Sequence, residues 1–123
     1  MFVHNILLAG CVTALALAGA ARADEARVVG VRAMFNGDGS YDFDVTLRHP
    51  DTGWDHYVDR WDVLGPDGKV LGSRVLYHPH VNEQPFTRSQ RISVPAGIRS
   101  VSIRTHCKID GDGKTLFKVE LPE

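Results

Sequence analysis

The fold of this chain is decided by a stretch in which apolar and polar side chains alternate without a break: Tyr41-Asp42-Phe43-Asp44-Val45-Thr46-Leu47-Arg48. Alternation with a period of two places successive side chains on opposite faces of a β-strand. One face of this strand is expected to be buried and the other to contact water, as in an antiparallel sheet. The stretch therefore predicts a sheet that covers a hydrophobic core on one side.

Similar patterns recur on both sides of this stretch, separated by turns rich in Gly, Pro, Asn and Asp. They predict further strands within residues 26–35, 54–64, 70–77, 88–94, 99–107 and 116–121. No segment after residue 23 shows the period of an amphipathic helix. About seven short strands predict an all-β fold, an antiparallel β-sandwich of the immunoglobulin-like or fibronectin type III-like kind, with a small barrel as the alternative.

Individual residues refine this prediction. Trp61 lies on the third predicted strand, the place of the core tryptophan in immunoglobulin domains, although the cysteine pair of those domains is missing. Cys107 is in phase with the apolar residues of its strand, so we expect a buried thiol that packs as a small hydrophobe. Val75, Tyr77 and Val81 share a parity and are expected to face the core. The likeness to immunoglobulin domains concerns architecture and assigns no function.

The first 23 residues are expected to be a signal peptide, followed by a single β-sandwich domain over residues 24–123. The apolar run Ile6–Ala21 leads to the A-x-A form of a signal peptidase site, so we expect cleavage after Ala23. The run is too short for a membrane span, and none is expected in the mature chain. A lipobox ending at Cys11 leaves lipid attachment as the alternative. Both routes predict a periplasmic or secreted protein.

The charge balance of the mature chain argues against a nucleic-acid surface. Removal of Arg22 from the 14 Lys and Arg leaves 13 of them against 15 Asp and Glu, and no basic cluster occurs. Removal of Cys11 leaves Cys107 without a second cysteine in the chain. An intramolecular disulfide is therefore excluded.

The side chains best suited to chemistry gather in the segment Tyr77–Arg88. His78 and His80 flank a proline, which favours an extended conformation for the residue before it. In an extended segment, side chains at i and i+2 lie on one face, about 6.6 Å apart along the strand. Two imidazoles so placed predict a copper or zinc site with Glu83 as a third ligand. Another histidine would complete the ligand set from a neighbouring strand: His49, His56 or His106.

The competing interpretation makes this segment an exposed edge. His78 and His80 have the opposite parity to Val75 and Tyr77, so their side chains would point into solvent. Pro79 removes a ladder donor and marks an edge strand or a strand end, where a partner protein could dock on unpaired backbone groups. The candidate binding surface consists of six residues: Trp54, His56, Asn82, Gln84, Phe86 and Arg88.

The sequence excludes several well-defined types of catalytic and metal site. A blue-copper site needs a His and usually a Met soon after its Cys, and Cys107 is followed by neither. His106 and Cys107 are neighbours on a strand, so their side chains point to opposite faces and do not pair. No H-E-x-x-H helix, G-x-S-x-G elbow or P-loop occurs, and we assign no catalytic residue. Trp54, Tyr57 and Trp61 could form a ligand platform, but aromatic residues at strand parity are more often core.

Three strings in the chain resemble those of a small, uncharacterised family of exported proteobacterial proteins. They are Gly53-Trp54-Asp55-His56-Tyr57, Pro66-Asp67-Gly68-Lys69-Val70-Leu71-Gly72 and His78-Pro79-His80-Val81-Asn82-Glu83-Gln84-Pro85-Phe86-Thr87-Arg88. The resemblance covers nearly all of the mature chain. It implies a periplasmic location and no activity, so it assigns no catalytic or binding residue.

Together these features favour a non-catalytic periplasmic binding or accessory module whose ligand is not identified, with copper or zinc at His78 and His80 as one candidate. Two alternatives are a metal-dependent periplasmic enzyme with a His/Glu centre and a docking module for another periplasmic protein that binds no metal. Three or more ligands that converge on a pocket with an open position would favour the enzyme. Outward, dispersed histidines on a flat edge would favour the binding module.

Overall fold

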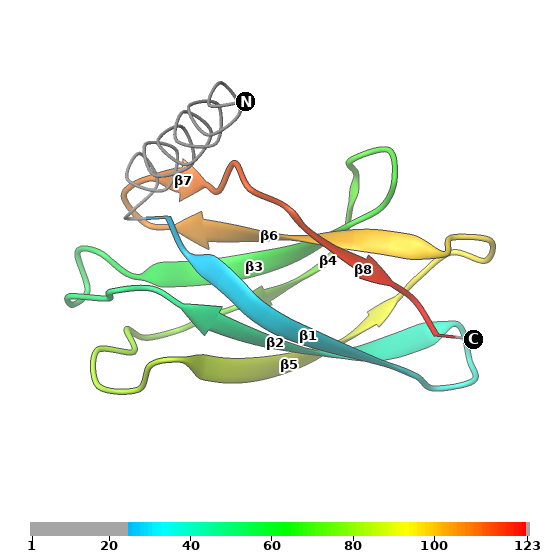
Figure 1. The fold of residues 1–123 in the computed structure, drawn as a ribbon, viewed down its shortest axis with the longest axis horizontal. Coiled ribbons are helices and arrows are strands. Elements are labelled where there is room, and N and C mark those ends of the chain that lie inside the picture. Colours follow the sequence, from blue (N-terminus) through cyan, green and yellow to red (C-terminus); the bar gives the residue numbers. More distant parts are fainter. Residues whose placement is uncertain (1–24, 123) are drawn as a thin grey trace, which may run out of the picture.

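The described chain is built from β-strands (Figure 1). A computed structural model describes residues 25–122, and over this range it contains eight strands and no helix. The strands are β1 (Arg27–Phe35), β2 (Ser40–Arg48), β3 (Val58–Leu64), β4 (Val70–Val75), β5 (Phe86–Ser93), β6 (Ser100–Cys107), β7 (Gly111–Asp112) and β8 (Phe117–Glu120). The all-β prediction is confirmed. The expected signal peptide, with its cleavage site and lipobox, lies outside the described residues.

The strands form two antiparallel sheets that pack as a β-sandwich. One sheet has the order β1-β2-β5, and the other has the order β4-β3-β6. The far edge of β6 pairs with β8 near its start and with β7 near its end. In the immunoglobulin scheme, β1, β2 and β5 take the places of strands A, B and E, and β3, β6 and β8 those of C, F and G. In Figure 1 the β1-β2-β5 layer lies below the layer of β3 and β6.

The core lies where the alternating patterns predict it. Phe43, Val45 and Leu47 on the inner face of β2 are completely buried, and so is Trp61 on β3. Cys107 is buried at the end of β6, in phase with the apolar residues before it. Complete burial of one large apolar side chain stabilises the fold by about 1.5–3 kcal/mol. Buried side chains on β2, β3 and β6 therefore stabilise the sandwich from which the connecting loops extend.

The parity predicted for the fourth strand is wrong. Val75, Tyr77 and Val81 are 43 %, 76 % and 50 % exposed, whereas Leu76 between them is buried. The inward parity of β4 includes Gly72, where a Cβ atom would lie 2.8 Å from the Ile92 side chain of the opposite sheet. A glycine on a strand often marks such a close approach. Leu76, directly after the end of β4, keeps this inward parity, and His80 is buried farther along the loop that follows.

A buried carboxylate ties together the three adjacent strands β4, β3 and β6. Asp62 of β3 is 1 % exposed and accepts hydrogen bonds from Ser73 Oγ of β4 (2.6 Å) and from Arg104 Nη2 of β6 (2.9 Å). Arg60 Nε donates a further hydrogen bond of 2.9 Å. Burial raises the pKa of Asp62, but these three donors outweigh burial and hold the pKa below its ordinary value. The network fixes the strands that lead into the loops described below.

Replacement of this carboxylate by an amide, Asp62→Asn, is expected to lower the free energy of unfolding at pH 7 by about 1–3 kcal/mol, because charge-assisted hydrogen bonds are lost. The folded pKa of Asp62 lies below the ordinary value of 3.8. Its stabilising contribution is therefore present above that value and is lost as pH falls through the folded pKa. Urea unfolding of both proteins at pH 7 and at acid pH should show a shrinking difference. A difference that stays constant with pH would contradict this account.

Candidate metal centre

Three connecting segments meet at one end of the sandwich, on the left in Figure 1: the β2–β3 loop, the β4–β5 loop and the turn after β6. His49 directly follows β2, and Cys107 is the last residue of β6. Val58, the first residue of β3, pairs with Cys107, so the start of β3 lies against the end of β6. Lys108 N also donates to Tyr57 O (3.0 Å). The register of β3 and β6 thus brings the segment before Val58 to the cysteine.

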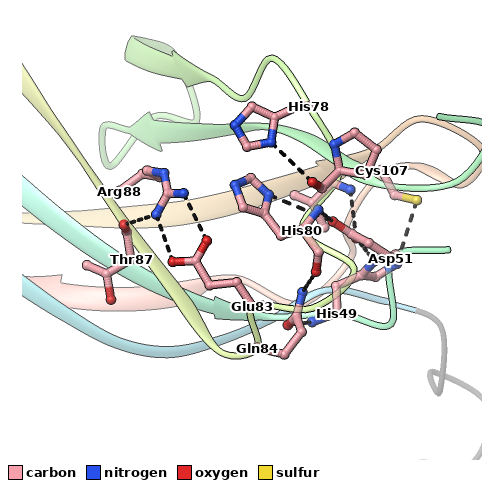
Figure 2. A network of polar contacts seen from close by, with 11 residues as sticks. His49, Asp51, His78, His80, Glu83, Gln84, Thr87, Arg88 and Cys107 are labelled. Atoms are coloured by element: carbon pink, nitrogen blue, oxygen red, sulfur yellow. Dashed lines mark hydrogen bonds and ion pairs between the residues drawn. The ribbon is translucent and has the colours of Figure 1, made fainter. Parts of the chain in front are cut away.

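A buried carboxylate, Asp51, holds the β2–β3 loop in place (Figure 2). Its Oδ1 accepts hydrogen bonds from His49 Nδ1 (2.5 Å) and from the backbone N–H of Val58 (3.2 Å). Its Oδ2 accepts the backbone N–H of His80 (2.8 Å), which belongs to the β4–β5 loop. In a neutral His49 imidazole this carboxylate keeps the proton on Nδ1 and so leaves a lone pair on Nε2. That nitrogen faces Cys107 Sγ at 3.8 Å.

Gln84 fastens the same two loops from the other side. Its Oε1 accepts the backbone N–H of His49 (2.9 Å), and its Nε2 donates to the carbonyl oxygen of His80 (2.9 Å). Asp51 and Gln84 together satisfy the backbone groups of both loops at the point where they touch. His49 is therefore held at its ring and at its backbone.

His56 presents a buried nitrogen without a hydrogen-bond partner, Nε2. A tight turn puts it there: His56 N donates to Gly53 O (3.1 Å), and Thr52 N donates to His56 O (3.0 Å). Its ring stands edge-on to that of His49, with ring centres 5.0 Å apart. An unpaired buried polar atom costs about 1–3 kcal/mol, so its position between an imidazole and a thiol calls for an explanation.

The ligand atoms of His49, His56 and Cys107 all lie within 4.8 Å of one another. Around one tetrahedral zinc ion, a sulfur at about 2.3 Å and nitrogens at about 2.0–2.1 Å lie about 3.3–3.6 Å apart. Small side-chain rotations therefore suffice to bring the three donors onto one ion. Among the residues that the structure describes, no other group of three or more metal-ligating side chains lies this close together.

The sulfur and its surroundings suit a bound cation. Burial raises the pKa of the Cys107 thiol, while the backbone N–H groups of Asp110 and Ile109 lower it. Those donors would stabilise a thiolate once a cation displaced the proton. Asp110 Oδ2 lies 3.5 Å from His56 Nε2, and the Asp110 side chain is 47 % exposed. Asp110 thus stands between the buried donors and solvent.

The histidines singled out in the sequence fall into separate places. His49 and His56 join Cys107, whereas His106 lies outside this cluster and its Nδ1 pairs with Asp59 Oδ1 (2.5 Å). Cys107 and His106 therefore point apart, as predicted for neighbours on a strand. His78 and His80 lie together on the β4–β5 loop, with ring centres 4.6 Å apart.

The predicted ligands His78, His80 and Glu83 lie on one loop but are not drawn together as closely. Glu83 is exposed and pairs with Arg88 (3.1 Å), and His78 Nδ1 lies 3.1 Å from the carbonyl oxygen of Pro79. The metal site predicted for these three residues stays a prediction. The candidate cluster at the end of β6 consists of different residues.

The exposure expected for His80 is wrong. Its ring is 4 % exposed and stacks on Phe86, with ring centres 3.9 Å apart and planes inclined by 6°. Burial, followed by the positive charge of Arg88, holds the pKa of His80 below its ordinary value. The ring is therefore neutral at neutral pH. His78, in contrast, is exposed as expected.

The candidate binding surface loses one of its six residues, because Phe86 is 1 % exposed and belongs to the core. Trp54 is 61 % exposed and packs edge-on against the half-buried Tyr57, with ring centres 5.8 Å apart. Asn82 is exposed, and Arg88 is occupied by Glu83. Gln84 forms hydrogen bonds with the β2–β3 and β4–β5 loops, and His56 belongs to the metal-ligating cluster.

Sequence reasoning missed Cys107 as a ligand because its strand phase was interpreted as a sign of inert burial. A usable signal was present. His49 continues the inward parity of Tyr41, Phe43, Val45 and Leu47, just as Cys107 ends the inward parity of β6. Two strands that end at the same end of a sandwich on inward-pointing donors place those donors near each other.

Comparison with known proteins adds two findings. Over 96 residues the chain is 44 % identical to a protein of Halomicrobium mukohataei described as "Putative lipoprotein". The match covers 78 % of this chain and 47 % of that protein, so the chain spans about half the length of the curated relative it matches. Among solved structures it resembles the superoxide reductase (1Fe-SOR) from Giardia intestinalis, with a TM-score of 0.46 and 16 % identity, over 74 % of this chain and 95 % of that one. No family model matches the chain.

Removal of the buried carboxylate, Asp51→Ala, is expected to lower the free energy of unfolding by about 2–4 kcal/mol. The reason is that the ring N–H of His49 and the backbone N–H groups of Val58 and His80 lose a buried acceptor. Urea unfolding measures the change. The matched control is Asp55→Ala on the same loop, where the side chain is exposed. Equal effects of the two substitutions would refute the role given to Asp51.

Proposed function

We propose that this protein binds one transition-metal ion, zinc or copper, through His49, His56 and Cys107. The observation that carries the proposal is the convergence of three donor atoms, from the end of β2, the β2–β3 loop and the end of β6, to within 4.8 Å. Residues so far apart in the sequence do not meet by local chain geometry. The sandwich and the Asp51 network hold them together before any ion arrives.

The donor set suits a borderline-soft metal. A thiolate selects copper(I) or zinc over hard cations such as calcium, and imidazole suits both metals. His49 is already in the tautomer that a metal ligand requires, since its other nitrogen donates to a carboxylate. A cation would also engage His56 Nε2, which makes no hydrogen bond and has the Asp110 carboxylate 3.5 Å away. Calcium and magnesium prefer oxygen ligands and are not expected to bind here.

We further infer that the protein is exported and acts as a binding or accessory module. The A-x-A sequence before Asp24 and the description of the Halomicrobium relative as a lipoprotein support export. Cleavage after Ala23 and lipid attachment at Cys11 remain the two routes, and mass spectrometry of the amino terminus distinguishes them. In the described range no helix is long and apolar enough to cross a membrane.

One observation favours a second candidate, a metal-dependent enzyme at the same site. Three side chains converge and the carboxylate of Asp110, 3.5 Å from His56 Nε2, is half exposed, so the ion would keep a coordination position facing solvent. Catalytic metal sites characteristically combine three protein ligands with such an open position. The ligand set is His/His/Cys, in place of the His/Glu centre that the sequence suggested.

The metal content of mature, untagged protein purified from the periplasm tests the principal proposal. We expect the wild type to hold zinc or copper at this cluster and Cys107→Ser to hold one equivalent less, because the thiolate is the strongest donor of the set. The matched control is His106→Gln, which removes an imidazole outside the cluster and should leave the metal in place. Equal metal content in the wild type and in Cys107→Ser, both as purified and after addition of zinc or copper, would overturn the proposal.

The open position can be tested separately on copper-loaded protein. Addition of azide should shift the absorption and electron paramagnetic resonance spectra, because an exogenous anion replaces solvent at the metal. Asp110→Ala should retain the metal and bind azide at least as well. Spectra that do not respond to azide in either protein would indicate a closed, structural centre and remove the enzyme candidate.

A further inference from the structure

A second set of donors surrounds an open hollow of about 550 Å³ beside the first cluster. The hollow is lined on one side by Gly53 and Trp54 of the β2–β3 loop and on the other by the segment from His78 to Glu83. Figure 2 shows His78 and His80 next to each other, with Glu83 close by. None of these side chains belongs to the His49–His56–Cys107 group.

His80 is the unexplained residue of this hollow. Its ring is 4 % exposed, yet neither ring nitrogen has a hydrogen-bond partner. Nδ1 lies 3.9 Å from Asp51 Oδ2, beyond hydrogen-bond distance but on the side of that carboxylate. Two unpaired buried nitrogens on one ring are rare, and an ion or an ordered water is the usual explanation.

His78 is oriented to complement it. Its Nδ1 lies 3.1 Å from the carbonyl oxygen of Pro79, which favours a proton on Nδ1 and a free lone pair on Nε2. The two ring centres are 4.6 Å apart. Two imidazoles bound to one ion at about 2.0–2.1 Å per bond place their ring centres about 4.5 Å apart at a right angle, as in tetragonal copper(II), and about 5.3 Å apart in a tetrahedral zinc site. The observed separation therefore fits a shared ion.

Glu83 supplies the negative charge. Its carboxylate pairs with Arg88 (3.1 Å), and the hydrogen bond from Arg88 holds the pKa of Glu83 below its ordinary value. Glu83 is exposed, so its side chain can turn from Arg88 towards an ion with little loss of packing. Asn82 and Val81 complete the wall of the hollow without adding charge.

We propose that His78, His80 and Glu83 form a second metal site, at the surface of the β4–β5 loop, that takes copper(II) or zinc. The site has two nitrogens and a carboxylate oxygen but no thiolate, so it suits copper(II) better than copper(I). Asp51 supports this site from behind, because one of its oxygens accepts the backbone N–H of His80 and the other contacts the ring of His49. The proposal does not depend on metal binding by the first cluster.

The experiment titrates copper(II) into untagged, full-length mature protein of the Cys107→Ser variant, which lacks the thiolate of the first cluster. We expect an equivalent of copper with two nitrogen ligands by electron paramagnetic resonance. His78→Ala should weaken this equivalent at least about tenfold, and Glu83→Gln should weaken it as well. His78 and Glu83 are exposed, so both variants should fold with unchanged melting temperatures.

The control is His106→Gln in the same background, which should leave copper binding unchanged. The proposal is overturned if the protein takes up no copper, or if all copper uptake persists undiminished in His78→Ala. In the wild type, zinc uptake gives a separate measure for each site. Loss of an equivalent in Cys107→Ser reports the first cluster, and loss of an equivalent in His78→Ala reports the second.

Discussion

The functional end of this molecule depends on one buried carboxylate. Asp51 is 5 % exposed and accepts hydrogen bonds from the ring of His49, the backbone of Val58 and the backbone of His80. A carboxylate in such a place is tolerated only when several donors surround it, because burial of an unpaired charge costs several kcal/mol. The requirement works in both directions. Each loop is held by the carboxylate, and the carboxylate is stable only while both loops supply their donors.

The sandwich explains why such a carboxylate can be placed at all. β2 and β6 belong to different sheets, and each ends on an inward-pointing donor, His49 and Cys107. Packing of the two sheets fixes the distance between these strand ends, and the Asp62 network keeps β3 and β6 in register on one side. The loops therefore start from rigid positions, so their side chains need little further ordering to form a site.

The strands that carry a clean alternation could be predicted from the sequence, because for β2 and β6 the buried face is also the apolar face. β4 could not, since its inward parity holds Gly72 and Arg74 while Val75 faces solvent. Close approach of Ile92 decides that parity, and no local pattern records a contact with another sheet. The candidate site could likewise be predicted only in part. Histidines were recognised as donors, but their grouping depends on which strand ends coincide in space.

Several buried polar atoms at this end of the molecule have no hydrogen-bond partner. Among residues 25–122, the buried side-chain atoms without a partner are His56 Nε2, both ring nitrogens of His80 and the indole nitrogen of Trp61. Three of these four atoms are imidazole nitrogens next to the loops that Asp51 joins. Native proteins satisfy almost all buried polar groups, and exceptions concentrate where function requires them. A fold that could have filled these positions with apolar side chains instead keeps imidazoles there, and imidazole is the commonest metal ligand among protein side chains.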